Sequence, residues 1–223
     1  MPPRAHIARK LVSVCHRLAE QGLVTATDGN VSARLGRGRF LVTPTGLNKG
    51  KLTARDLVEV NAAGQRVVGR RTASTEIGMH LFVYQERPDV QAVVHAHPTY
   101  ATGFAVAHLS LTAPLLPEVV IGLGEIPVAP YGTPSTPELA ETLLPFVKTA
   151  NAVLLGNHGA VTFGGNLEEA YSRMEKVEQA ACIAFVARLL GGEKPLAAQD
   201  VEKLRGLTGK GSGETPTEPF SRT

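Results

Sequence analysis

Short strand patterns joined by tight turns alternate with helical patterns along this chain, and this alternation limits the folds it can adopt. Residues 57–61 and 66–68 have the composition of strands, and Ala62-Ala63-Gly64 joins them as a hairpin. A hairpin pairs its strands antiparallel, whereas neighbouring parallel strands need a long crossover connection. The pattern therefore predicts an α/β fold with a mixed or largely antiparallel sheet covered by helices, not a doubly wound parallel sheet.

Apolar spacing and capping residues predict the other elements. An opening helix, with apolar residues three or four positions apart, ends near Gly22. Ser74 or Thr75 caps a second helix, and Asn166 with Glu169 resembles a capping box for the longest helix. Further helices are expected near residues 100–107 and 137–147, and further strands near residues 39–43, 118–121, 126–129, 152–155 and 160–163.

The 223 residues are 43% hydrophobic and 19% charged, which is the composition of an ordinary globular chain. We expect one domain over residues 1–205 and a flexible tail over 206–223, which has almost no apolar anchors. No signal-peptide pattern and no apolar stretch of membrane-spanning length is evident, which predicts a cytoplasmic protein without a membrane partner. A net charge of +3, 5% aromatic residues and no tryptophan argue against nucleic acid as a partner.

Three histidines form the pattern of a metal site. His95 and His97 stand two residues apart on an apolar strand pattern, and alternate strand residues project to the same face. His158 lies between two apolar runs and directly precedes Gly159, which places it on a turn at a strand end. Three histidine ligands with one open position are typical of catalytic zinc. Packed or surface histidines are the alternative interpretation.

Three turns rich in Gly, Thr, Ser and Asn can cradle a phosphate, because glycine lets backbone N–H groups approach an anion and hydroxyls add donors. These turns are residues 27–32, 43–46 and 74–76. Ordinary turns and helix caps are the alternative. Glu76 is either an acidic residue favoured in a first helical turn or a base beside the metal. No Walker A and no G-x-G-x-x-G pattern is present, so nucleotide binding is not supported.

Five motifs in this order resemble the class II aldolase/adducin family, over roughly residues 5 to 192. They are Asp28-Gly29-Asn30-Val31-Ser32, Thr43-Pro44-Thr45-Gly46, Ser74-Thr75-Glu76, His95-Ala96-His97 and Asn157-His158-Gly159. Within the family, the chain is most similar to the members that act on L-fuculose-1-phosphate. The resemblance implies a single three-layer αβα domain with a mixed, largely antiparallel central sheet. It also implies a homotetramer with active sites at the subunit interfaces.

The resemblance assigns roles to these residues. It places Zn²⁺, or another divalent metal, on His95, His97 and His158. Glu76 is implied as a further metal ligand when no substrate is bound, and as the catalytic acid/base when substrate is present. The positions implied to bind the substrate phosphate are Gly29, Asn30, Thr45, Gly46, Ser74 and Thr75.

The implied activity is reversible cleavage of a ketose 1-phosphate to dihydroxyacetone phosphate and an aldehyde, with a phosphorylated sugar as the small-molecule substrate. Leu116 stands where the fuculose enzymes carry a tyrosine on the aldehyde side, and Pro134 replaces an aromatic residue. The resemblance therefore says less about the identity of the aldehyde than about the metal and phosphate sites. The alternatives are a methylthioribulose-1-phosphate dehydratase, a ribulose-5-phosphate 4-epimerase, a sugar-acid phosphate decarboxylase, or a non-catalytic adducin-like module.

Overall fold

A computed structural model describes residues 3–36 and 38–208 and contains one eight-stranded sheet. The strands are β1 (Asn30–Gly36), β2 (Arg39–Val42), β3 (Val58–Asn61), β4 (Arg66–Val68), β5 (Ala92–Ala96), β6 (Val128–Ala129), β7 (Ala152–Leu155) and β8 (Gly159–Gly164). Their order is β4-β3-β2-β1-β5-β8-β7-β6. Only β6 and β7 pair in parallel, which confirms the mixed, largely antiparallel sheet.

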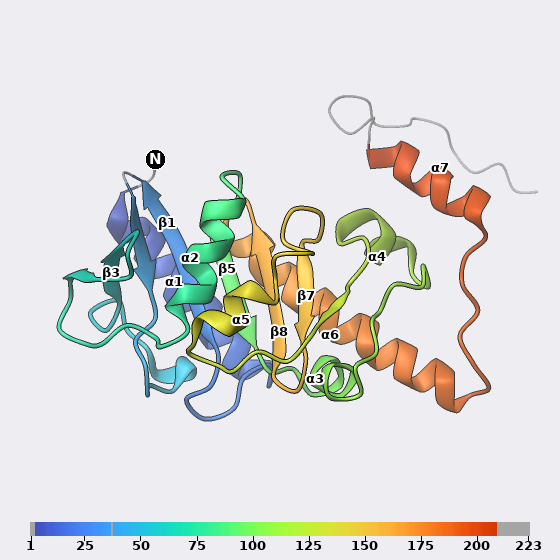
Figure 1. Ribbon diagram of the computed structural model, residues 1–223, viewed down its shortest axis with the longest axis horizontal. Helices are drawn as coiled ribbons and strands as arrows, with labels where there is room; N and C mark the ends of the chain where they lie inside the picture. Colours follow the sequence, from blue (N-terminus) through green and yellow to red (C-terminus); the bar gives the residue numbers. More distant parts are fainter. Residues whose placement is uncertain (1–2, 37, 209–223) are drawn as a thin grey trace, which may run out of the picture.

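Helices cover both faces of this sheet (Figure 1). They are α1 (Arg4–Glu20), a short 3-10 helix η1 (Lys49–Lys51), α2 (Ile77–Glu86), α3 (Thr99–Val106), α4 (Pro117–Gly122), α5 (Pro137–Glu141), α6 (Leu167–Leu189) and α7 (Ala198–Thr208). One core packs α1, α3 and α6 on the sheet, and a second packs α2 and α5 on its other face. Val94 belongs to the first core and Val93 to the second, as expected for alternate strand residues. The three-layer αβα prediction is confirmed.

Several element predictions need correction. Residues 118–121 lie in helix α4 and not in a strand, because Pro117 fits the first helical position and Glu118 favours the first turn. The expected turn at 27–32 ends at residue 29, and Asn30 begins strand β1. Helix α5 ends at Glu141, short of residue 147. Glu76 itself occupies the N-cap position of α2, so neither Ser74 nor Thr75 does.

The C-terminal part of the described chain differs from the prediction in one respect. Helix α7 ends at Thr208, so the first three residues of the expected tail are helical. Residues 209–223 lie outside the described residues. No helix within the described ranges is long and apolar enough to cross a membrane.

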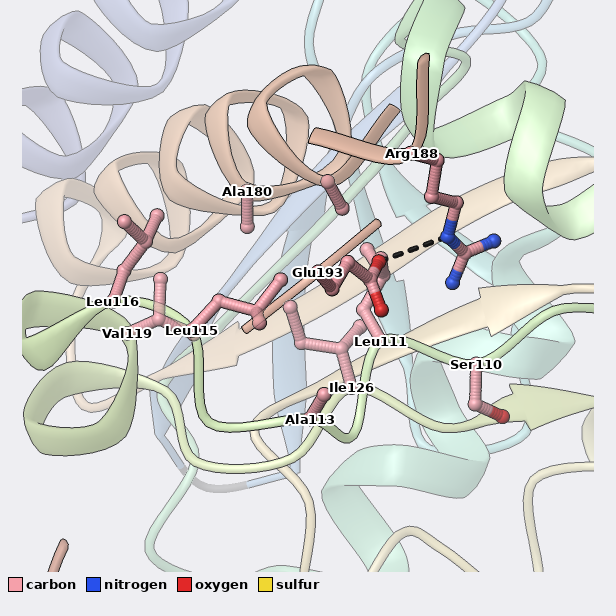
Figure 2. Close-up of a pocket in the computed structure, with 11 residues that line it drawn as sticks. Ser110, Leu111, Ala113, Leu115, Leu116, Val119, Ile126, Ala180, Arg188 and Glu193 are labelled. Atoms are coloured by element: carbon pink, nitrogen blue, oxygen red, sulfur yellow. Dashed lines mark hydrogen bonds and ion pairs between the residues drawn. The ribbon is translucent and has the colours of Figure 1, made fainter. Parts of the chain in front are cut away.

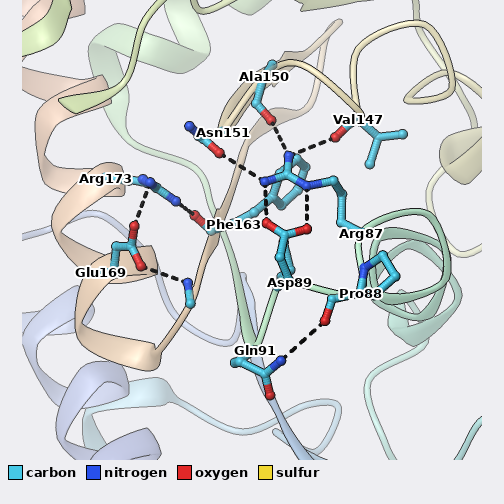
Figure 3. A network of polar contacts seen from close by, with 12 residues as sticks. Arg87, Pro88, Asp89, Gln91, Val147, Ala150, Asn151, Phe163, Glu169 and Arg173 are labelled. Carbon is cyan, nitrogen blue, oxygen red and sulfur yellow. Dashed lines mark hydrogen bonds and ion pairs between the residues drawn. The ribbon is translucent and has the colours of Figure 1, made fainter. Parts of the chain in front are cut away.

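A polar network closes one end of the sheet, near the start of β5 (Figure 3). Arg87 binds both carboxylate oxygens of Asp89 and also donates to the carbonyl groups of Val147 and Ala150. These contacts join the C-terminal end of α2 to the segment that enters β7. The other end of β5 carries His95.

Asn166 begins α6 as predicted, because its side-chain oxygen accepts a hydrogen bond from the backbone N–H of Glu169 at 3.0 Å. Glu169 in turn accepts from the backbone N–H of Gly165 instead of the N-cap N–H of a standard capping box. The cap therefore satisfies one of the free N–H groups of a 23-residue helix that packs along the sheet.

We expect Asn166→Ala to lower the free energy of unfolding by about 1 kcal/mol, because it removes this acceptor. Asn166→Ser keeps an acceptor and is the matched control, with a smaller loss. Urea unfolding followed by circular dichroism measures both. Equal stability of the alanine and serine variants would show that the cap contributes nothing.

Candidate active site

The candidate site is built on the end of β5 in the middle of the sheet. His95 pairs across the sheet with Asn30 on β1 and with Val161 on β8, and its side chain is fully buried. Its Nδ1 donates to the carbonyl oxygen of Ala160 at 2.9 Å. A carbonyl only accepts, so the proton is on Nδ1 and the lone pair of Nε2 is free to bind a metal.

His97 follows the strand and faces the same centre. Its Nε2 lies 3.0 Å from Nε2 of His95. Burial lowers the pKa of His97, and it lowers the pKa of His95 more than the Glu76 carboxylate raises it. Both rings are therefore neutral at neutral pH, which is the form that binds a metal.

His158 reaches this centre from a tight turn between β7 and β8. The backbone N–H of His158 donates to the carbonyl of Leu155, and Asn157 adopts a positive φ of 55°. Asparagine tolerates this left-handed conformation better than most residues. The His158 ring centroid lies 4.7 Å from that of His95 and 5.0 Å from that of His97. The three rings therefore surround one point.

Glu76, at the start of α2, adds a carboxylate to the three rings. Its Oε1 lies 3.2 Å from Nε2 of His158, and its Oε2 lies 3.4 Å from Nε2 of His95. Burial alone would raise the pKa of Glu76, but the hydrogen bonds that it accepts from His158 and Asn30 hold it well below its usual range. Glu76 is therefore an anion that can ligate a metal or accept a proton.

The donor set fits a zinc-type ion. Ligand atoms of a tetrahedral zinc with bonds of about 2.0–2.1 Å lie roughly 3.3 Å apart. One ligand atom from each histidine lies within 4.8 Å of the others, and the closest pair is 3.0 Å apart. Nδ1 of His158 is also buried without a hydrogen-bond partner among the described residues. Three imidazoles beside one carboxylate thus form a site that a divalent ion can occupy.

The three predicted phosphate turns lie beside the histidines. Thr45 donates from its backbone N–H to the carbonyl of Thr72, and Ser74 donates to the carbonyl of Thr43, so two of the turns are paired backbone to backbone. In the third turn, Gly29 has a positive φ of 72°. A Cβ there would lie 2.8 Å from the carbonyl oxygen of His95, so only glycine fits against the metal-binding strand.

The predicted site residues meet in one cavity of ≈ 290 Å³. Its lining includes all six predicted phosphate-binding residues, Glu76, His97 and His158. His95 does not line it, because His95 is fully buried behind the other two histidines. The structure thus brings together every residue that the motifs singled out.

Lys49 is a site residue that the sequence analysis did not identify. Its ammonium group is buried and donates to the carbonyl oxygens of Thr27 and Leu47, at 2.7 and 2.9 Å. It therefore links the first phosphate turn to the second. Among the described residues that line the cavity, Lys49 is the only lysine or arginine. Asn48 caps η1, but nothing in the local sequence indicates that the side chain of Lys49 turns inward.

Leu116 lies away from this cavity. It lines a separate, mostly apolar pocket beside α6, together with Leu115, Val119 and Ala180 (Figure 2). The Arg188–Glu193 ion pair, at 2.8 Å, closes one side of that pocket. Within one chain, the residue at position 116 therefore does not contact the histidine cluster.

Comparison with known proteins identifies the relatives of this chain. Residues 9–185 match a family model described as the class II aldolase and adducin N-terminal domain. A 3-oxo-tetronate 4-phosphate decarboxylase of Pectobacterium atrosepticum is 36% identical over 191 residues, which cover 83% of this chain and 86% of the relative. An L-fuculose phosphate aldolase of Escherichia coli is 36% identical over 197 residues, which cover 88% and 91%.

The fold comparison agrees with these sequence matches. A solved structure of L-fuculose 1-phosphate aldolase superposes with a TM-score of 0.84 at 32% identity, and the match covers 91% of this chain and 95% of that one. Proteins with two different activities are thus similar to this chain to the same degree.

Gly159 gives a test of the metal centre that leaves every ligand in place. A Cβ at this position would lie 2.6 Å from both the carbonyl oxygen of Ala96 and Cδ2 of His97. We expect Gly159→Ala to displace His97 and to weaken zinc binding about 10- to 100-fold. Competition with a chromophoric chelator measures the affinity.

Gly103→Ala is the matched control, because a Cβ at that helical position meets nothing within 4 Å. We expect it to leave the zinc affinity unchanged and to stabilise α3 by up to about 1 kcal/mol. Unchanged zinc affinity in a folded Gly159→Ala protein would contradict the proposed ligand geometry.

Proposed function

Because the chain belongs to the class II aldolase and adducin family, we propose that it is a zinc-dependent sugar-phosphate aldolase. The proposed reaction is reversible cleavage of a ketose 1-phosphate, of the L-fuculose-1-phosphate type, to dihydroxyacetone phosphate and an aldehyde. The observation that carries the proposal is a cavity beside three convergent histidines, lined by an ionised carboxylate and by three turns rich in glycine and hydroxyl groups. A non-catalytic module has no need of that combination.

His95, His97 and His158 would hold the metal. When bound there, a zinc ion supplies Lewis-acid chemistry, because it withdraws electrons from the substrate carbonyl next to the bond that breaks. Zinc is favoured over harder ions because these three ligands are imidazole nitrogens.

The remaining residues bind the phosphate and move a proton. Backbone N–H groups at Gly29 and Gly46 and the hydroxyls of Thr45, Ser74 and Thr75 hold the phosphate, which fixes the distance from the phosphate to the reacting carbons. In cleavage, the C4 hydroxyl loses its proton to solvent, the C3–C4 bond breaks, its electron pair stays on C3 as an enediolate, and C4 leaves as the aldehyde. The Glu76 carboxylate takes up a proton from solvent and delivers it to C3, and the same carboxylate removes that proton in the reverse direction.

Decarboxylation is the second candidate function. Loss of carbon dioxide from a 3-oxo-tetronate 4-phosphate leaves its electron pair on the adjacent carbon, which gives the same three-carbon enediolate and then dihydroxyacetone phosphate. Carbon dioxide leaves without a proton transfer on its side, whereas the C4 hydroxyl has to lose its proton as the aldehyde leaves. Leu116 in place of a tyrosine, together with the decarboxylase relative, favours this candidate.

We also propose a homotetramer whose active sites lie at the subunit interfaces. The cavity of one chain is open on one side and has polar turns on its described walls. Residues from a second chain would complete the side on which the aldehyde or the carboxylate of the substrate lies.

An assay of dihydroxyacetone phosphate release, coupled to glycerol-3-phosphate dehydrogenase and NADH, tests the function. With added zinc, we expect turnover of L-fuculose-1-phosphate, and Glu76→Gln should lower kcat by about 10²- to 10⁴-fold because the proton carrier is lost. Unchanged cleavage by the Glu76→Gln variant would disprove the proton-transfer role.

The same assay separates the two candidates. A decarboxylase releases carbon dioxide and dihydroxyacetone phosphate in equal amounts from 3-oxo-tetronate 4-phosphate and leaves L-fuculose-1-phosphate intact. Removal of the metal with a chelator should abolish turnover in both cases, and zinc should restore it.

A further inference from the structure

Strand β1 and helix α2 lie side by side with matched spacings. Two strand residues span about 6.8 Å, and four helix residues span about 6.0 Å. Residues at i, i+2 and i+4 on a strand can therefore each face a residue at i, i+4 and i+8 on a helix that runs beside it. On β1 these positions are Asn30, Ser32 and Arg34, and they face α2. On α2 the matching positions are Glu76, His80 and Tyr84.

The facing side chains form one continuous chain of hydrogen bonds. Asn30 Nδ2 donates to Glu76 Oε2 at 2.6 Å, and Asn30 Oδ1 lies 2.5 Å from His80 Nε2. His80 Nδ1 lies 2.7 Å from Ser32 Oγ, which lies 2.8 Å from Tyr84 Oη. All of these side chains except Glu76 are buried. We call this set, Tyr84–Ser32–His80–Asn30, the polar ladder.

The orientation of the Asn30 amide fixes the direction of every bond in the ladder. Its NH₂ group, which only donates, faces Glu76, and its carbonyl oxygen, which only accepts, faces His80. Nε2 of His80 must then carry the proton, and Nδ1 must accept from the hydroxyl of Ser32. Tyr84 donates to Ser32 in turn. All donors thus point toward Glu76.

We propose that His80 is a positioning residue that holds Asn30, and through it the Glu76 carboxylate, in the orientation that proton transfer needs. The inference rests on the proposed function of Glu76. Without His80, the amide of Asn30 could rotate and present its oxygen to the carboxylate, which would repel Glu76 from its place between His95 and His158. Asn30 also lines the cavity beside the phosphate turns, so the ladder fixes the proton carrier relative to the phosphate site.

A packing role alone does not explain these residues. Apolar side chains of similar volume fill such a space at least as stably as buried polar groups, which have to be hydrogen-bonded throughout. The ladder also needs a neutral His80, because a doubly protonated ring would lose the bond from Ser32. Burial lowers the pKa of His80 to about 4, against the opposing effect of Glu76, so the ring stays neutral at neutral pH.

The tautomer of His80 tests the ladder without reference to any reaction. In the metal-free protein, a long-range ¹H–¹⁵N spectrum at pH 7 should show Nε2 protonated and Nδ1 unprotonated for His80. The signal is assigned by its absence from the His80→Gln spectrum. A ring protonated on Nδ1, or on both nitrogens, would overturn the proposal even if the enzyme proves active.

Two near-isosteric variants separate positioning from packing. Glutamine places an N–H close to the position of Nε2 and keeps the bond to Asn30, whereas asparagine reaches only the position of Nδ1 and keeps the bond to Ser32. We expect His80→Asn to lower kcat about 10- to 100-fold and His80→Gln to stay within about threefold of the parent. Equal losses in the two variants, or no loss in either, would overturn the proposal.

Thr162→Val is the matched control for loss of a buried hydrogen bond, because its hydroxyl donates to the carbonyl of Ala170 on the other face of the sheet. Its kcat should stay unchanged.

If His80→Asn does not fold, Ser32→Ala breaks the ladder one step further from Glu76, and a kcat equal to the parent would again overturn the proposal. A parent enzyme that turns over no sugar phosphate would refute the proposed function, while the tautomer would still test the ladder.

Discussion

The pairing of β1 with β5 at the centre of the sheet is the constraint on which the rest of the site depends. It places Asn30 directly opposite His95, so the amide that binds the Glu76 carboxylate and the imidazole of the histidine cluster lie on the same face. Gly29 makes this close approach possible because a Cβ there would contact the carbonyl of His95. The pairing with β8 then supplies the Ala160 carbonyl that fixes the His95 tautomer. A shift of one residue in the pairing of β5 with β1 or with β8 would turn these groups to opposite faces of the sheet.

The two ends of β5 have different roles. At its start, the Arg87–Asp89 network satisfies the carbonyl groups of Val147 and Ala150 and joins α2 to the entry of β7. At its end, Glu76 lines a cavity and His95 lies buried beside it, and each is held by a hydrogen bond, His95 to Ala160 and Glu76 to Asn30. In the proposed function, regular elements therefore hold the groups assigned to the reaction, and turns hold those assigned to the phosphate. This division would keep the proton carrier fixed and leave backbone N–H groups free for an anion.

The sequence predicted what depends on local spacing. Strand alternation placed His95 and His97 on one face, and a flanking glycine placed His158 on a turn; all three meet in the structure. It failed where contacts are distant: β1 was not recognised as a strand from Asn30, because its pairing with residues 92–95 leaves no local pattern. The contacts of Lys49 with Thr27 and of His80 with Asn30 span 22 and 50 residues, so no local rule indicates them. The strand predicted at residues 118–121 was wrong, because the run of β-branched residues was given more weight than Pro117, which favours the start of a helix.

An aldolase and a decarboxylase on this scaffold differ only in the fragment that leaves, because both form the enediolate of dihydroxyacetone phosphate. Exchange of hydrogen between dihydroxyacetone phosphate and deuterated water, followed by NMR, therefore tests the central claim most directly, without the second fragment. The account predicts metal-dependent exchange of one of the two hydrogens on the hydroxymethyl carbon, lost in Glu76→Gln. Absence of exchange in a zinc-loaded protein that binds dihydroxyacetone phosphate would contradict it.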